Sequence, residues 1–270
     1  MRMSRPGGVA ASQPDPGYVR VDRRESVAMV TLDHPADRNA LSLTMTRALA
    51  EAVHQVTSDD GIGAMVLTAT GTAFCAGGSV DDLLEPKVPL GEMYAGFVAV
   101  MECGLPTVAA VQGPALGAGM NLALACDVIV CSPSARFETR FLDIGLHPGG
   151  GHLWQLRQRI GRQGAAALAL FGESLDGEEA ASHQLAWRCV PEGDLLEVAY
   201  ELAAAAAGRD RALLALTRRT LDDSAVCLRA TDAIALELER QQWSMGRPEF
   251  AEALGRLRAR LGRGEGSGRA

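Results

Sequence analysis

Two glycine-rich segments contain the residues best placed to do chemistry in this 270-residue sequence. They are residues 74–81 (FCAGGSVD) and residues 113–127 (GPALGAGMNLALACD). Each follows an apolar, strand-like run and leads into a helix-like run, so its backbone N–H groups are expected to point out of a sheet edge with a helix dipole behind them. Such groups bind a phosphate or stabilise an oxyanion. Tight strand-to-helix packing is the alternative explanation for the glycines.

The sequence lacks the motifs of several other kinds of site. The patterns G-x-G-x-x-G and G-x-x-x-x-G-K-[ST] are absent, which argues against Rossmann or P-loop binding of nucleotide phosphates. The absence of G-x-S-x-G argues against a Ser/His/Asp nucleophile, so Ser79 and Asp81 are interpreted as hydrogen-bonding turn residues. No C-x-x-C pair or His/Cys metal spacing occurs, and no metal is expected. Six cysteines are predicted to be buried, reduced thiols: Cys75, Cys103, Cys126, Cys131, Cys189 and Cys227.

Strands and helices alternate around these turns. We predict strands at 27–32, 64–68, 107–111 and 127–131, a helix capped by Ser42 that runs to about 57, and a short buried helix at 118–125. This alternation favours an α/β fold with crossover connections and a mainly parallel sheet.

The second half of the sequence has mainly helical patterns. Helices are predicted at 152–160, 165–171, 178–186, 194–207, 210–221, 225–243 and 249–261, with a short strand at 187–190. The resulting plan is a disordered leader (1–17), an α/β core (18–205), a C-terminal helical region (206–262) and a disordered tail (263–270). The C-terminal helices have apolar faces without an obvious partner in the chain, which suggests an oligomer.

The sequence resembles the crotonase (enoyl-CoA hydratase/isomerase) family in an ordered series of motifs between about residues 25 and 260. The matching segments are 37–41 (DRNAL), 74–81, 106–119 (PTVAAVQGPALGAG), 124–127 (LACD), 137–151 in part, and 178–180 (EEA). The resemblance implies a ββα superhelix with a helical C-terminal trimerisation region, assembled as a homotrimer or hexamer.

The resemblance also implies an oxyanion hole formed by the N–H groups of Gly78 and Ala118, which would bind the thioester oxygen of an acyl-CoA and stabilise an enolate. No cofactor is implied, because the coenzyme A thioester is itself the substrate. The backbone near Asn39 and Ala40, and residues 76–80, would contact the adenine end of coenzyme A. The implied binding residues are Arg38, Asn39, Ala40, Ala76, Gly77, Gly78, Ser79, Val80, Leu116, Gly117, Phe141 and Gly149.

Both carboxylates expected of a typical hydratase of this family are missing. Asn121 and Phe141 stand where the family has glutamates that position water and move a proton. Asn121 can orient water or a substrate oxygen, but it cannot accept a proton near pH 7. Asp143 and His147 are candidate replacements, with a turn contact and a pocket-wall or capping role as the respective structural alternatives. His152 is expected near the start of a helix.

Residues 83–105 are predicted to form a helix or mobile cover. Met93, Tyr94, Phe97 and Met101 fit one helical face, which is explained either by core packing or by an apolar lid over an acyl chain.

Bulk composition limits the partners. With 26 basic and 33 acidic residues the net charge is −7, which argues against nucleic-acid binding, although Arg38 or Arg157 could hold a phosphate locally. No apolar run is long enough to cross a membrane, and no secretory signal occurs, so a cytoplasmic protein is expected. Three functions remain open: a family enzyme with an unusual proton-transfer set, an acyl-CoA-binding protein without catalysis, and a structural oligomer.

Overall fold

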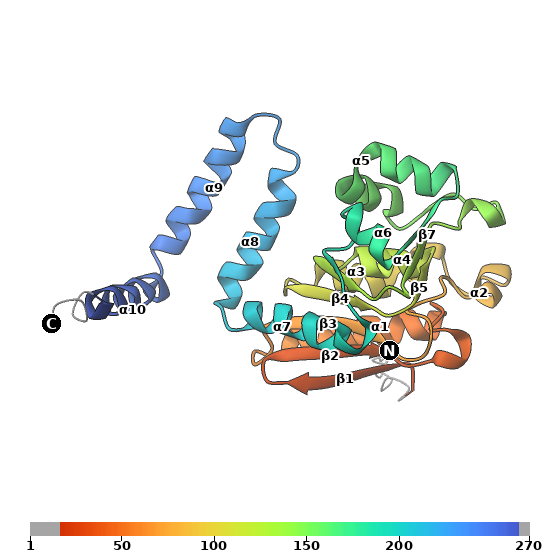
Figure 1. Cartoon of the computed structure of the whole chain (residues 1–270), viewed down its shortest axis with the longest axis horizontal. Coiled ribbons are helices and arrows are strands. Elements are labelled where there is room, and N and C mark those ends of the chain that lie inside the picture. Colours follow the sequence, from red (N-terminus) through yellow and green to blue (C-terminus); the bar gives the residue numbers. More distant parts are fainter. Residues whose placement is uncertain (1–16, 265–270) are drawn as a thin grey trace, which may run out of the picture. The chain divides into compact units, whose positions relative to one another are not determined.

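The computed structural model describes residues 17–264, and the chain divides into two compact units after Gly208. The first unit is built on a six-stranded sheet (Figure 1) in which β1 is antiparallel to β2 and every other pairing is parallel. The predicted α/β class and mainly parallel sheet are confirmed. In sheet order the strands are β1 (Val19–Arg24), β2 (Val27–Leu32), β3 (Ala64–Ala69), β4 (Thr107–Val111), β6 (Val128–Cys131) and β9 (Arg188–Cys189).

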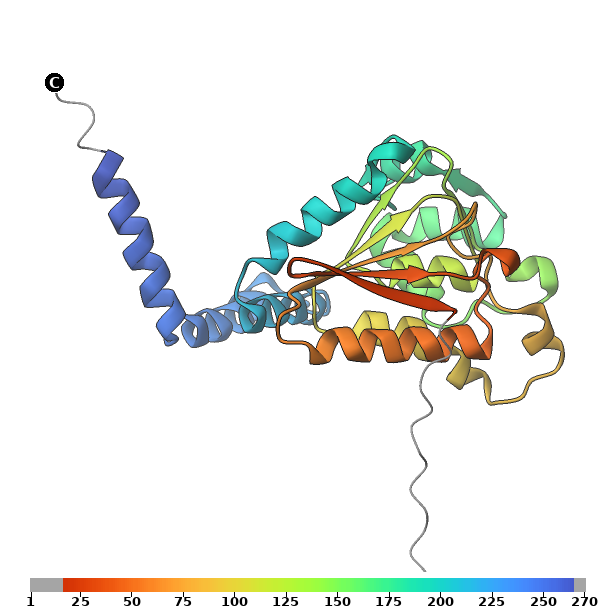
Figure 2. The ribbon, with the colours of Figure 1, turned by 90° about the horizontal axis from the view of Figure 1, so that it is seen from below.

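Both faces of this sheet are covered, because successive strand residues point to opposite sides. In β3, Ala64 and Val66 pack with residues of α7 (Leu195–Ala207), whereas Met65 and Leu67 face the larger core that contains α1 (Leu43–Ser58). Figure 2 shows the sheet between these two helices. Burial on both faces explains why the central strands read as continuous apolar runs.

A smaller sheet and several short helices lie beside the main sheet. The sequence did not predict this second sheet, because strands of three residues are too short to show a periodic pattern. It contains β5 (Pro114–Leu116), β7 (Arg136–Glu138) and β8 (Ser174–Asp176), in that order. The nearby helical segments are α2 (Val80–Leu84), η2 (Leu90–Tyr94), α3 (Ala95–Glu102), α4 (Ala118–Leu124), η3 (Leu142–Ile144) and α6 (Gly177–Ser182); η1 (Pro35–Asp37) and η4 (Glu192–Asp194) lie in loops.

Several predicted boundaries were wrong. One helix, α5 (His152–Leu170), replaces two predicted ones; it bends at Gly161, whose φ of +69° is available to glycine at little cost. The helix predicted at 178–186 already ends at Ser182. Strand β1 was missed because five of its six residues are exposed, so it carries no apolar signal. Residues 83–105 form short helical pieces rather than one helix.

The second unit consists of α8 (Arg211–Ser224), α9 (Ala230–Met245) and α10 (Pro248–Gly264). Asp210 caps α8 by accepting a hydrogen bond from Leu213 N–H at 2.7 Å, and it pairs with Arg247. Leu228 and Ile234 are 96% and 62% exposed. The trimerisation role assigned to this region stays a prediction.

The predicted leader and tail fall outside the described residues, except for Gly17 and for residues 263–264, which belong to α10. None of the helices described is both long enough and apolar enough to cross a membrane.

Candidate active site

The two glycine-rich turns lie side by side at one edge of the first unit. A parallel bridge joins Cys75 to Ala115. Across it, Cys75 N–H donates to the Pro114 carbonyl and Leu116 N–H donates to the Cys75 carbonyl, each at 3.0 Å. Segments about 40 residues apart in sequence are therefore held in a fixed register.

Two glycines make this approach possible. A Cβ on Gly119 would stand 2.2 Å from the carbonyl oxygen of Cys75, which is far inside van der Waals contact. Gly77 has a φ of +102°, and a Cβ there would stand 2.9 Å from the Leu116 carbonyl oxygen. Side chains at these positions would push the turns apart.

Gly78 and Ala118 both line one cavity. Ala118 is the first residue of α4, where a helix leaves its N–H groups without intrahelical acceptors. Within residues 17–264, neither amide donates to another backbone group. Two such donors are the arrangement that stabilises negative charge developing on an oxygen.

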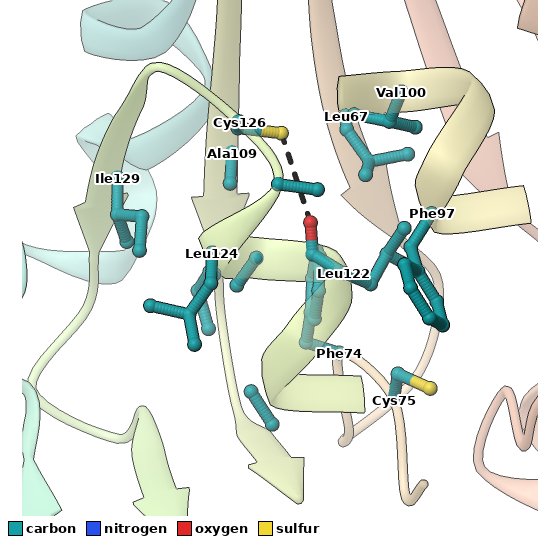
Figure 3. Close-up of a cluster of buried hydrophobic side chains, with 14 of the residues drawn as sticks. Leu67, Phe74, Cys75, Phe97, Val100, Ala109, Leu122, Leu124, Cys126 and Ile129 are labelled. Carbon is teal, nitrogen blue, oxygen red and sulfur yellow. Dashed lines mark hydrogen bonds between the residues drawn. The ribbon is translucent and has the colours of Figure 1, made fainter. Parts of the chain in front are cut away.

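Helix α4 is fixed by the core behind the turns. Leu122 on α4 packs among fully or almost fully buried side chains that include Phe74 and Phe97 (Figure 3). The Cys126 thiol donates to the Leu122 carbonyl at 3.9 Å. Movement of α4 would disrupt this packing, so the Ala118 amide and the Asn121 side chain are held in place before a ligand binds.

The cavity has a volume of about 710 Å³ and is lined mainly by apolar side chains. Of the predicted binding residues, Ala76, Gly77, Gly78, Ser79, Val80, Leu116, Gly117, Phe141 and Gly149 line it. Met93, Tyr94 and Phe97 also line it, whereas Met101 packs against the core. The predicted apolar face from 93 to 101 therefore both lines the cavity and packs against the core.

A buried chain of hydrogen bonds begins at Asn121, which is 1% exposed but reaches the cavity wall. Its Nδ2 donates to the Gly149 carbonyl at 3.0 Å, so its Oδ1 must face His152. His152 Nδ1 donates to that Oδ1 at 2.5 Å, and the Thr139 hydroxyl donates to His152 Nε2 at 3.1 Å. The chain requires a neutral imidazole protonated at Nδ1.

Burial lowers the pKa of His152 to about 4. The unfolded chain binds a proton at this residue near pH 6.5, whereas the folded protein resists doing so until about pH 4. The unfolded state therefore gains protons first as the pH falls, and the free energy of unfolding decreases across this window. We expect a loss of about 2 kcal/mol between pH 7 and pH 5 from this residue.

Denaturant titrations at several pH values measure this effect. His152→Gln has no titratable ring, so its unfolding free energy should vary less over the same range by about that amount. Equal pH dependence in the two proteins would show that His152 has the same pKa in the folded and unfolded states.

The sequence pattern did not indicate that His152 belongs to the site. It predicted only that His152 lies near the start of a helix, and the structure shows it to be the first residue of α5. Asn121 and His152 are 31 residues apart, and no local spacing links them. The partnership arises from tertiary packing, in which the Phe141 and His152 rings form a T-shaped pair at a centroid distance of 5.1 Å.

The proposed proton-transfer residues Asp143 and His147 line the cavity and are exposed to solvent. His147 Nδ1 donates to the Pro148 carbonyl at 2.8 Å. Neither residue takes part in the Asn121–His152–Thr139 chain. Their catalytic role stays a prediction.

Arg38, Asn39 and Ala40 are not among the residues that line the cavity. The Asn39 side chain is completely buried and holds the loop together: its Oδ1 accepts from His34 N–H at 2.8 Å, and its Nδ2 donates to the Thr70 and Ala73 carbonyls. The Asn39 side chain is therefore fully used in stabilising the loop, and any contact between Asn39 and a ligand would have to involve its backbone.

The cysteines form no disulfide, and the prediction that all are buried was wrong for some. Cys103, Cys189 and Cys227 are only partly buried. Burial raises the pKa of Cys75 to about 12, which keeps that thiol protonated and unreactive at neutral pH. Residues 17–264 hold no cluster of three or more His, Cys, Asp or Glu side chains arranged for a metal ion.

Comparisons with known proteins by sequence and by structure indicate the same family. A profile of the enoyl-CoA hydratase/isomerase family matches residues 22–254. A protein of Mycobacterium tuberculosis named as a probable enoyl-CoA hydratase is 41% identical over 255 residues, which covers 90% of this chain and 97% of the relative. A Rhodobacter capsulatus protein of the same description is 40% identical over 181 residues, covering 65% of this chain and 70% of the relative.

Solved structures agree with this assignment. A probable enoyl-CoA hydratase/isomerase from Mycobacterium abscessus superimposes with a TM-score of 0.81 at 28% identity, covering 90% of this chain and 97% of that one. An enoyl-CoA hydratase from a Polaromonas species gives a TM-score of 0.83 at 26% identity, covering 90% and 98%.

Proposed function

Because this chain belongs to the enoyl-CoA hydratase/isomerase family, we propose that it acts on an acyl-CoA thioester through an enolate whose oxygen is held by the amides of Gly78 and Ala118. The observation that carries this proposal is that Gly78 and Ala118 line the same apolar cavity while neither amide donates to a backbone group within residues 17–264. Beside apolar walls a fixed donor is worth more than in water, because the effective dielectric constant around the developing charge is lower.

Standard hydration is disfavoured. Hydration requires one group to deprotonate water and another to move a proton at the α-carbon, and each contributes about 10²–10⁴ in rate. Asn121 and Phe141 can do neither at neutral pH. The enolate is therefore expected to serve another outcome, such as isomerisation, with Asp143 or His147 exchanging the α-proton.

The second candidate is an acyl-CoA-binding protein without catalysis. It is favoured by the neutral Asn121–His152–Thr139 chain, which offers no group that accepts a proton near pH 7. Both functions require the thioester site, and they differ only in whether a titratable group reaches the ligand.

Deuterium exchange at the α-carbon distinguishes an enzyme from a binding protein without catalysis. The protein is incubated in D₂O with a panel of saturated and unsaturated acyl-CoAs, and deuterium at the α-carbon and product masses are followed by mass spectrometry. If the protein is an enzyme, we expect deuterium exchange at the α-carbon. Its rate should fall by about 10²-fold in Asp143→Asn or His147→Ala if the replaced residue is the base.

Binding without exchange or product would favour the second function. Exchange that both variants leave unchanged would eliminate these two residues as the base. Leu196→Ala, a change at an exposed position outside the cavity lining, controls for nonspecific effects of substitution.

A further inference from the structure

Tyr94 carries a polar group inside the cavity that neither the family assignment nor the proposed thioester site uses. It is the last residue of η2 and lines the cavity beside Phe97, with ring centroids 5.2 Å apart. Within residues 17–264 its hydroxyl has no hydrogen-bond partner. A hydroxyl in an apolar wall without a partner is costly unless water or a ligand satisfies it.

The Tyr94 hydroxyl and the Asn121 amide meet at the same loop residue. A Cβ on Gly149 would stand 2.5 Å from the Tyr94 oxygen, so the hydroxyl lies directly against this glycine. The Gly149 carbonyl accepts from Asn121 Nδ2 at 3.0 Å. Two polar side chains from η2 and α4 therefore flank one point of the cavity wall.

The hydrogen-bond chain fixes what Asn121 presents there. With Oδ1 engaged by His152 and one N–H engaged by Gly149, the second N–H of Nδ2 is the remaining donor. The absence of a side chain at Gly150 lets this loop lie close to Phe97 and Asn121, because a Cβ there would stand 2.5 Å from Phe97 Cζ and 2.9 Å from Asn121 Nδ2. Together with the Tyr94 O–H, the amide forms a site rich in donors.

We propose that Tyr94 and Asn121 form a second oxygen-binding subsite, so that the protein prefers acyl thioesters carrying an additional acceptor oxygen on the acyl chain, such as a 3-oxo group. Tyr94 is the specificity-determining residue of this subsite. The proposal rests on the proposed thioester site, whose amides would bind the first oxygen, and adds a separate recognition of the second. The surrounding apolar wall makes an unpaired donor costly when the ligand lacks that oxygen.

Binding measurements with matched ligands test the subsite. Two four-carbon acyl-CoA analogues, one saturated and one with a 3-oxo group, are made with CH₂ replacing the thioester sulfur so that they are not hydrolysed. Their Kd values are measured by calorimetry, and recovery of unchanged ligand is checked by mass spectrometry. The wild type should bind the 3-oxo analogue about tenfold or more tightly.

Tyr94→Phe removes only the hydroxyl and should abolish most of this preference by weakening binding of the 3-oxo analogue, while the saturated analogue binds as tightly as before or more tightly, because no unpaired hydroxyl is left. Tyr200→Phe is the matched control, because the Tyr200 hydroxyl contacts Glu25 at 3.2 Å and does not line the cavity. It should keep the wild-type preference.

The outcomes are distinct. Equal binding of both analogues to the wild type, or an equal loss for both in Tyr94→Phe, would overturn the subsite and leave the thioester site standing. Failure of the wild type to bind either analogue would overturn the proposed function together with the subsite.

Discussion

Replacing Ala118 by proline is expected to reduce the rate of α-proton exchange on a bound acyl-CoA by about 100- to 1,000-fold, which is the usual effect of losing one oxyanion donor. Proline lacks the N–H, and its ring occupies the space toward which that group points. Ala118 is the first residue of α4, a position where proline fits the helix well, and the preceding Gly117 tolerates unusual backbone angles. The fold should therefore survive.

Ala118→Gly is the control for this experiment, because it shortens the side chain at the same position and keeps the N–H. It should retain activity within about an order of magnitude, since the donor is worth more than the methyl group. If the proline variant folded and exchanged protons at the wild-type rate, the Ala118 amide would have no part in stabilising the enolate.

Replacing Gly119 by alanine is expected to lower the free energy of unfolding by about 3 kcal/mol or more, at or above the upper end for overpacking. The added Cβ would lie 2.2 Å from the Cys75 oxygen and 2.8 Å from the Cys75 carbonyl carbon. Those are backbone atoms bound into the bridge with Ala115, so they cannot yield as the end of a flexible side chain would. Relief requires the turns to separate, which would also disrupt the proposed oxyanion site.

Gly193→Ala is the matched control, since a Cβ at Gly193 would meet no atom within 4 Å. Its unfolding midpoint in urea should change little, whereas that of Gly119→Ala should fall clearly at an unchanged m-value. A Gly119→Ala protein as stable as the wild type would mean that the two turns are not held as closely as described.

The proposed site has two parts, the amide pair and the proton-transfer positions, and they differ in how closely they follow the family pattern. The predicted amide pair depends on backbone and glycine, which both turns supply. The predicted proton-transfer positions depend on side chains, and Asn121 and Phe141 stand where the family resemblance leads us to expect carboxylates. In their place the cavity holds a neutral hydrogen-bond chain and the Tyr94 hydroxyl, a combination that favours binding and polarising oxygen over activating water.

Local sequence was sufficient to predict the central strands, α1 and α4, because each carries a strong apolar pattern or a capping residue. Ser42, for example, accepts a hydrogen bond from Met45 N–H at the start of α1. The short sheet of β5, β7 and β8 could not be predicted, because three residues show no period and the pairing partners are distant in sequence. Strand β1 was not predicted, because it is an exposed edge strand with mostly polar side chains.

The sequence by itself identified the family and the two glycine-rich turns, and it predicts the loss of both expected carboxylates, since these depend on residue identity at ordered positions. The tertiary structure alone decided which groups share the cavity. It placed His152 behind Asn121 and Tyr94 against Gly149, and it assigned the Asn39 side chain to its own loop. These outcomes depend on contacts between residues roughly 30 to 55 positions apart, which packing of the whole unit creates and no local spacing encodes.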